Sequence, residues 1–183
     1  MRLFRSFRDD RALQRGSASY VALLMADPEP TDVEWLASNA TRGDTDHAIW
    51  ELRYLRRALG VLVAQRDALD DRTPSEVLRT LAARMERDPN VDAELRELAD
   101  RQFNARLSAY RDALTSRGHG TPATRVAQNM LAFAGGPIRA DDPVVVRGAA
   151  LVSALLAAAG DALRASFGTA ELPDDVPPSQ LAR

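Results

Sequence analysis

The stretch DTDHAIWELRYLRRALGVLVAQRDALDDR, residues 44–72, decides the fold of this chain. Its large apolar side chains recur at alternating steps of four and three residues, which places them on one stripe of an α-helix. The run LGVLVA, residues 59–64, is apolar on all sides, so we expect neighbouring helices to surround it. Asp44 or Thr45 can cap the start of the helix. The sequence therefore predicts a central helix whose stripe comprises Ala48, Leu52, Leu55, Leu59, Leu62 and Leu69.

One charged residue, Arg66, interrupts that stripe. A guanidinium group among apolar side chains must either extend along its stem to solvent or bind a carboxylate. We expect Arg66 to bind a buried acid, because it lies on the stripe itself. Asp70, one helical turn further on, is the nearest candidate, and an acid on another helix is the alternative. Arg66 and Asp70 are thus the predicted structural polar residues.

Six further helices are predicted from capping residues, prolines and apolar periods. Thr31 and Glu34 have the spacing of a capping box, and Asn90 can cap a later helix. The last helix is apolar on nearly every side between residues 149 and 159, so we expect it to be buried beside the central helix. The predicted ranges are 17–26, 32–40, 74–87, 91–114, 122–134 and 144–167.

These elements define an expected architecture. No segment alternates apolar and polar residues in the manner of a strand, which indicates an all-α fold. We expect a single-domain bundle of about six or seven helices, with two long helices and a buried apolar C-terminal helix. The bundle would span residues 17–168, after a basic and aromatic segment at 1–16. A proline-rich acidic tail at 169–183 is expected to lack a regular fold.

Composition excludes several kinds of chemistry. The chain has no cysteine, which rules out disulfides, thiol nucleophiles and cysteine metal sites. All 24 basic residues are arginine, so neither a Walker A phosphate loop nor a Schiff base to lysine can form. The motifs of serine hydrolases, zinc proteases and dinucleotide-binding folds are also missing from the sequence. We expect no cofactor.

Charge and hydropathy bear on location and partners. The net charge of −2 argues against nucleic acid as a partner. The start of the chain lacks the continuous apolar core of a secretory signal, which predicts a cytoplasmic protein. The most apolar run, residues 148–159, is shorter than the roughly 20 residues that a membrane-spanning helix needs.

The first residues of the chain form a candidate interaction segment. A short basic stretch with large apolar side chains can lie against an anionic membrane surface or bind an acidic partner. The alternative is a frayed first helix packed on the bundle. The residues that would make the contact are Arg2, Phe4, Arg5, Phe7 and Arg8.

Two polar faces flank the apolar stripe of the central helix. His47 and Glu51 are four residues apart, so they project side by side and could form a metal-binding or acid–base pair. Arg53 and Arg57 are spaced in the same way on the other face. The more ordinary interpretation, which we favour, is a solvated helix surface. A hard cation could be bound by oxygen atoms of Asp44, Asp46 and Glu51, although the spacing does not require it.

These observations favour one function and leave a second open. The leading hypothesis is a non-catalytic helical interaction protein, such as an adaptor or assembly factor, that binds a protein partner or forms a homodimer. It would act through helix faces and through the N-terminal arginine and phenylalanine residues. The alternative is a small-molecule- or metal-binding enzyme with a polar pocket beside residues 45–71. There, His47 or Glu51 would serve as the base, and Arg53 or Arg57 would bind an anion.

Overall fold

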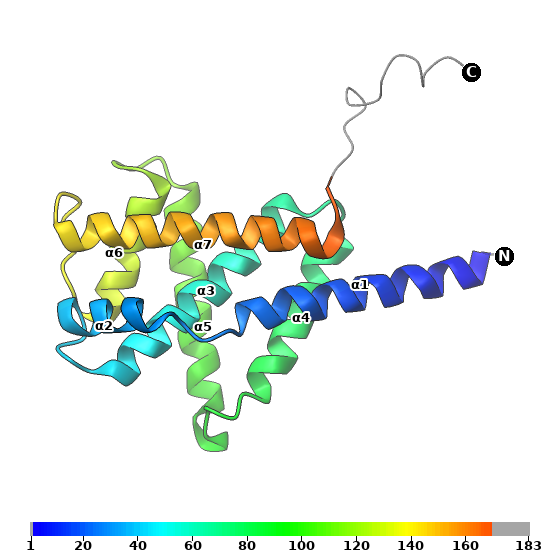
Figure 1. Ribbon diagram of the computed structural model, residues 1–183, viewed down its shortest axis with the longest axis horizontal. Coiled ribbons are helices and arrows are strands. Elements are labelled where there is room, and N and C mark those ends of the chain that lie inside the picture. Colours follow the sequence, from blue (N-terminus) through cyan, green and yellow to red (C-terminus); the bar gives the residue numbers. More distant parts are fainter. Residues whose placement is uncertain (1, 170–183) are drawn as a thin grey trace, which may run out of the picture.

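The computed structural model describes residues 2–169, with side chains from Asp10 onward, and this part of the chain is all-helical, as predicted (Figure 1). Within it lie seven α-helices, one short 3-10 helix and no strand. The predicted tail, residues 169–183, lies almost entirely outside the described residues. The elements are α1 (Arg2–Leu24), α2 (Pro30–Asn39), α3 (Thr45–Asp67), α4 (Arg72–Glu86), η1 (Ala93–Leu95), α5 (Arg96–Thr115), α6 (Pro122–Ala134) and α7 (Pro143–Phe167).

Helix α3 is the centre of the bundle, as its apolar pattern predicts. It packs against each of the other six α-helices of the described chain. Leu59, in the middle of the apolar run, is fully buried. The predicted cap is also confirmed, because a carboxylate oxygen of Asp44 accepts a hydrogen bond from the backbone N–H of His47 at 2.9 Å.

The predicted end of α3 is wrong by one turn. The helix ends at Asp67, and Ala68 already has extended backbone angles. Leu69, which was expected on the buried stripe, is therefore outside the helix and 53% exposed. The physical reason lies in the next helix, because the side chain of Asp70 accepts hydrogen bonds from the backbone N–H groups of Arg72 and Thr73 at the start of α4.

Helix α1 is longer than expected, because residues 2–24 form one continuous helix and not a separate segment followed by a helix from Ser17. Gly16 does not interrupt it; instead it lets α7 approach, since a Cβ atom there would lie 2.8 Å from the carbonyl oxygen of Ser166. Asp10 binds Arg72 of α4 in an ion pair. Before that residue, α1 continues beyond the rest of the bundle, at the right of Figure 1. The described chain consequently has four helices of 20 residues or more, where the sequence predicted three, namely two long helices and the C-terminal helix.

Two other predicted helix starts are also wrong. The second helix begins at Pro30, with no side-chain cap from Thr31 or elsewhere. Asn90 does not cap a helix, because its amide group donates to Asp88, and α5 starts only after the 3-10 turn η1. Leu95 and Leu98, which a helix from residue 91 would have turned inward, are therefore 51% and 43% exposed.

The predicted bounds of α7 are confirmed, and Asp142 caps it by accepting from the N–H of Val144. The helix packs beside α3, as expected. Its burial is one-sided, however, because the opposite face, which includes Val146, Ala150 and Ala154, is exposed. The run at residues 148–159 is part of a helix of 25 residues that is long and apolar enough to cross a membrane, a test that core helices also pass. The buried face comprises Val145, Gly148, Val152, Ala159, Gly160 and Leu163.

Candidate functional site

The first half of α3 holds a buried ion pair at Glu51. The carboxylate of Glu51 is 1% exposed and accepts hydrogen bonds from Nε of Arg106 at 2.8 Å and from Nη2 of the same residue. Arg106 comes from α5, and its guanidinium lies over the rings of Tyr54 and Phe133, 4.9 and 4.5 Å from their centroids. His47 completes the cluster, with Nε2 3.3 Å from Oε1 of Glu51. The prediction of a solvated helix surface is therefore wrong at Glu51, because its carboxylate is buried.

The electrostatics of this cluster follow from its burial. Burial by itself would lower the pKa of Arg106, but the hydrogen bonds and charge of Glu51 outweigh it and raise that pKa. Burial also raises the pKa of Tyr110, the next aromatic residue on α5, and the negative charge of Glu51 adds to that effect. Both shifts keep Arg106 positively charged and Tyr110 neutral near neutral pH.

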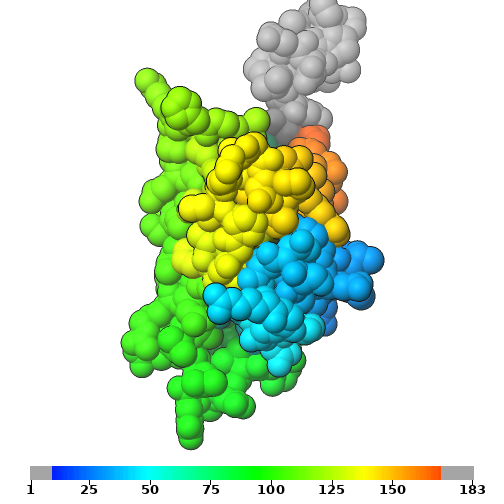
Figure 2. Space-filling model, turned by 90° about the vertical axis from the view of Figure 1, so that its left-hand side faces the viewer, coloured from blue at the N-terminus to red at the C-terminus, as the bar shows by residue number. Residues whose placement is uncertain are grey.

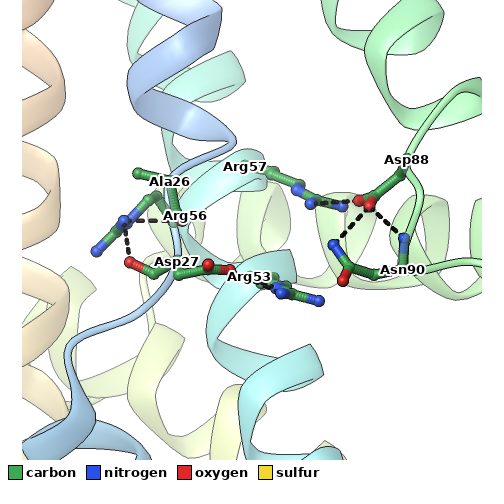
Figure 3. Close-up of polar contacts among 7 residues, drawn as sticks. All are labelled: Ala26, Asp27, Arg53, Arg56, Arg57, Asp88 and Asn90. Atoms are coloured by element: carbon green, nitrogen blue, oxygen red, sulfur yellow. Dashed lines mark hydrogen bonds and ion pairs between the residues drawn. The ribbon is translucent and has the colours of Figure 1, made fainter.

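A second buried pair joins α3 to the loop after α4. Nη2 of Arg57 donates to Oδ2 of Asp88 at 2.9 Å, and both side chains are 3% exposed (Figure 3). Asp88 also accepts from the backbone N–H and the side-chain amide of Asn90. Nε of Arg57 has no hydrogen-bond partner among the described residues. Desolvation consequently lowers the pKa of Arg57 despite its carboxylate partner.

A groove with a volume of about 630 Å³ lies between α2 and α3. Arg53 lies at one end of it and binds Asp27 at 2.6 Å (Figure 3). We call it the α2–α3 groove. Its apolar lining residues are Pro28, Pro30, Val33, Ala37 and Ile49. Its polar lining residues are Asp27, Glu34, Ser38, Thr45 and Arg53.

A smaller pocket of about 170 Å³ lies between α3 and the start of α5. Trp50 and Tyr54 supply its aromatic wall, with ring centroids 5.6 Å apart. The guanidinium groups of Arg53 and Arg57 lie 4.9 and 5.8 Å from the Trp50 ring. We call this cavity the Trp50 pocket. The rest of its lining is Asn90, Val91, Asp92, Leu95, Leu98, Ala99 and Gln102.

The residues proposed for catalysis do not converge on one cavity. Arg53 lines the α2–α3 groove, whereas His47, Glu51 and Arg57 line neither that groove nor the Trp50 pocket. The carboxylate of Glu51 is already occupied by Arg106, and Arg57 binds Asp88.

The residues suggested for metal binding are not brought together either. Among the side chains described, those of residues 10–169, no group of three or more histidine, aspartate or glutamate residues is placed so that it could hold a metal ion. Asp44 serves as the helix cap.

The expected partnership of Arg66 is wrong. Its side chain is 64% exposed and binds the adjacent Asp67, with Nε 2.6 Å from Oδ1, so it anchors no buried acid. Because α3 ends at Asp67, the last turn lies at the edge of the bundle, where a guanidinium reaches solvent. Asp70 does not bind Arg66 but accepts from the N–H groups that open α4. The side chains of Arg2, Phe4, Arg5, Phe7 and Arg8 lie outside the described part of the structure.

Sequence reasoning missed the partners of the buried charges. Arg106 was absent from the candidate residues, although it stands one residue before Leu107 on the apolar face of its helix. Asp88, which directly follows the predicted helix at 74–87, was not a candidate either. Their separations of 55 and 31 residues from Glu51 and Arg57 leave no local spacing to detect. An arginine next to an apolar stripe is the one available signal.

Comparisons with known proteins identify no relative: no protein family, no characterised protein and no solved structure matches this chain.

Proposed function

We propose that this protein is a non-catalytic helical interaction protein that binds protein partners through helix faces around α3 and through its N-terminal segment. The observation that carries the proposal is the Trp50 pocket. Tryptophan, tyrosine and arginine dominate the energetic centres of protein interfaces. Trp50 and Tyr54 line this pocket, and the guanidinium of Arg53 lies 4.9 Å from the Trp50 ring. Two large leucines, Leu95 and Leu98, are exposed at its rim.

The size of the pocket supports a side chain of a partner as its occupant. Its volume of about 170 Å³ is below the roughly 300 to 1,000 Å³ that is usual for small-molecule sites. It suits one large apolar side chain that projects from a partner helix. The internal pairing of Glu51 and Arg57 agrees with this proposal, because it leaves these groups unavailable as general bases or anion ligands.

A photoreactive amino acid at position 98, introduced in the cells that produce the protein, tests this proposal. The matched control is Leu23, another leucine that is 43% exposed but lines neither cavity. We expect one discrete protein adduct from position 98 and none from position 23. Trp50→Ala should remove the adduct. Equal labelling at both positions, or no adduct at position 98, would reject the proposal.

One observation favours the alternative, a small-molecule-binding protein or enzyme. The α2–α3 groove, with about 630 Å³, lies within the usual range for small-molecule sites. Of the proposed catalytic residues, however, only Arg53 lines it, and Arg53 is paired with Asp27. Native mass spectrometry of protein purified from its source tests the alternative. A bound small molecule that is lost in Arg53→Met would favour it over the interaction protein.

A further inference from the structure

The end of the molecule that holds the α2–α3 groove has an excess of carboxylates. Between residues 27 and 46 the sequence carries six carboxylates and a single arginine, and two of these acids are paired with arginines of other helices, Asp27 with Arg53 and Asp32 with Arg147. One of these acids, Glu34, lines the groove; its side chain is exposed and makes no ion pair within the described residues. The floor between the acids is apolar, from Val33, Ala37 and Ile49. Figure 2 faces this end and shows α2 and the start of α3, in blue and cyan, open at the surface. The groove therefore suits a segment that is both basic and apolar.

The chain itself contains such a segment at the start of α1. Residues 2–8 carry three arginines and no acid, together with Leu3, Phe4 and Phe7. They belong to a helix that is anchored to the bundle by the ion pair of Asp10 with Arg72 of α4 and by the packing of Gly16 on α7. In Figure 1 the beginning of this helix extends away from the bundle. Residues 2–8 span about two turns of this helix, roughly 10 Å.

We propose that the α2–α3 groove binds the first two turns of α1 from a second copy of this chain. Opposite charges would steer the two surfaces together, and the apolar floor would bury phenylalanine side chains. Recognition of an amphipathic helix by an apolar groove is a common mode of protein binding. The inference rests on the proposed function, because it names a partner for the N-terminal segment.

The positions of the two surfaces determine the kind of assembly. Helix α1 begins at one end of the longest axis of the molecule, and α2 with the start of α3 lies at the other (Figure 1). A helix directed away from its own bundle cannot reach the groove of the same copy. The contact joins different patches on the two copies, so it either occurs twice in a reciprocal two-fold dimer or continues into a larger ring or an open chain.

Analytical ultracentrifugation of the full-length protein tests the inference. Between about 1 and 100 μM, the weight-average mass should rise above the 20.0 kDa of one chain, because protein interfaces reach micromolar affinity or better. Higher ionic strength should reverse the rise, since exposed charges are screened. A mass of 20.0 kDa throughout would overturn the inference.

Two variants disable one surface each. Glu34→Arg with Ser38→Arg fills and recharges the groove at two exposed positions, and Arg5→Glu with Arg8→Glu reverses the charge of the N-terminal segment. Each should remain monomeric by itself. Arg79→Glu with Arg101→Glu, at positions that are 65% and 69% exposed on α4 and α5, is the matched control and should associate like the wild type. Circular dichroism verifies that all three remain folded.

Mixing the two variants distinguishes this arrangement from other forms of self-association. The groove variant keeps an intact N-terminal segment, and the other variant keeps an intact groove. We expect an equimolar mixture to form a heterodimer of twice the single-chain mass and nothing larger. No heterodimer, or self-association by either variant alone, would overturn the inference. The proposed function has a separate readout, because crosslinking at position 98 to a different protein would persist even if the wild type proved monomeric.

Discussion

The two buried arginines of this bundle differ in how completely they are satisfied. Arg106 donates to Glu51 through two nitrogen atoms and to the carbonyl of Gln102 through the third. Arg57 donates to Asp88 through one nitrogen atom only, and its Nε has no partner in the described chain. Glu51 raises the pKa of Arg106, whereas desolvation lowers that of Arg57.

The difference shows that burial does not measure the strength of an ion pair. Arg57 has the more buried side chain, at 3% exposed against 9% for Arg106, but it has fewer hydrogen bonds to offset its loss of water. Removal of one partner should therefore lower the free energy of unfolding more at the fully bonded Glu51–Arg106 pair than at the Arg57–Asp88 pair.

The largest effect is expected for Arg106→Met. This change leaves the Glu51 carboxylate buried, with His47 as its remaining ion-pair partner in the described chain. Breaking such a pair costs about 3 to 5 kcal/mol, so urea unfolding should show a loss of that order. The control is the double variant Glu51→Leu with Arg106→Met, which strands no charge and should recover most of the loss. Equal instability of the single and double variants would mean that packing, and not charge, is responsible.

A smaller effect is expected for Arg57→Met. Asp88 keeps its two hydrogen bonds from Asn90, and the unbonded Nε disappears. A lost hydrogen bond to a charged group then costs about 1.5 kcal/mol. Urea unfolding of this variant beside Arg106→Met gives the comparison directly. A loss as large as that of Arg106→Met would show that Asn90 does not satisfy Asp88.

The change in stability with pH that arises from the Arg57–Asp88 pair should be smaller than either of these two losses. Burial would raise the pKa of Asp88, but hydrogen bonds from Asn90 and Arg57 outweigh it and lower that pKa. A depressed carboxyl pKa stabilises the fold above the unfolded value of about 3.9, and the stabilisation is lost as the pH falls through the folded pKa. The stability difference between wild type and Asp88→Asn should thus be constant from pH 7 to 5 and shrink below about pH 4. A stability difference that grows as the pH falls would contradict the lowered pKa of Asp88.

The smallest effect is expected for Arg66→Met. Its ion pair with Asp67 is at the surface, and surface substitutions usually change stability by less than about 0.5 kcal/mol. Chemical unfolding at neutral pH should not distinguish this variant from the wild type. A loss of several kcal/mol would indicate a buried partner for Arg66 and would remove the contrast with Arg106.

Local signals in the sequence determined much of the fold. The apolar stripe of α3 predicted a central helix, and Asp44 predicted its start. The predicted ranges 122–134 and 144–167 agree with α6 (Pro122–Ala134) and α7 (Pro143–Phe167). These predictions succeed because a helix cap and a helical stripe depend on residues within four positions of each other.

The tertiary structure alone decided which polar groups are buried and which surfaces stay open. The partners of Glu51 and Arg57 come from α5 and the loop after α4, and no local pattern specifies how those elements cross α3. The sequence predicted a buried α7, but neighbours cover only one of its faces. Arg66 was expected inside because it lies on the stripe, and it is outside because the bundle ends before it. Periodicity identifies the face of a helix, whereas burial depends on how far the neighbouring helices extend along it.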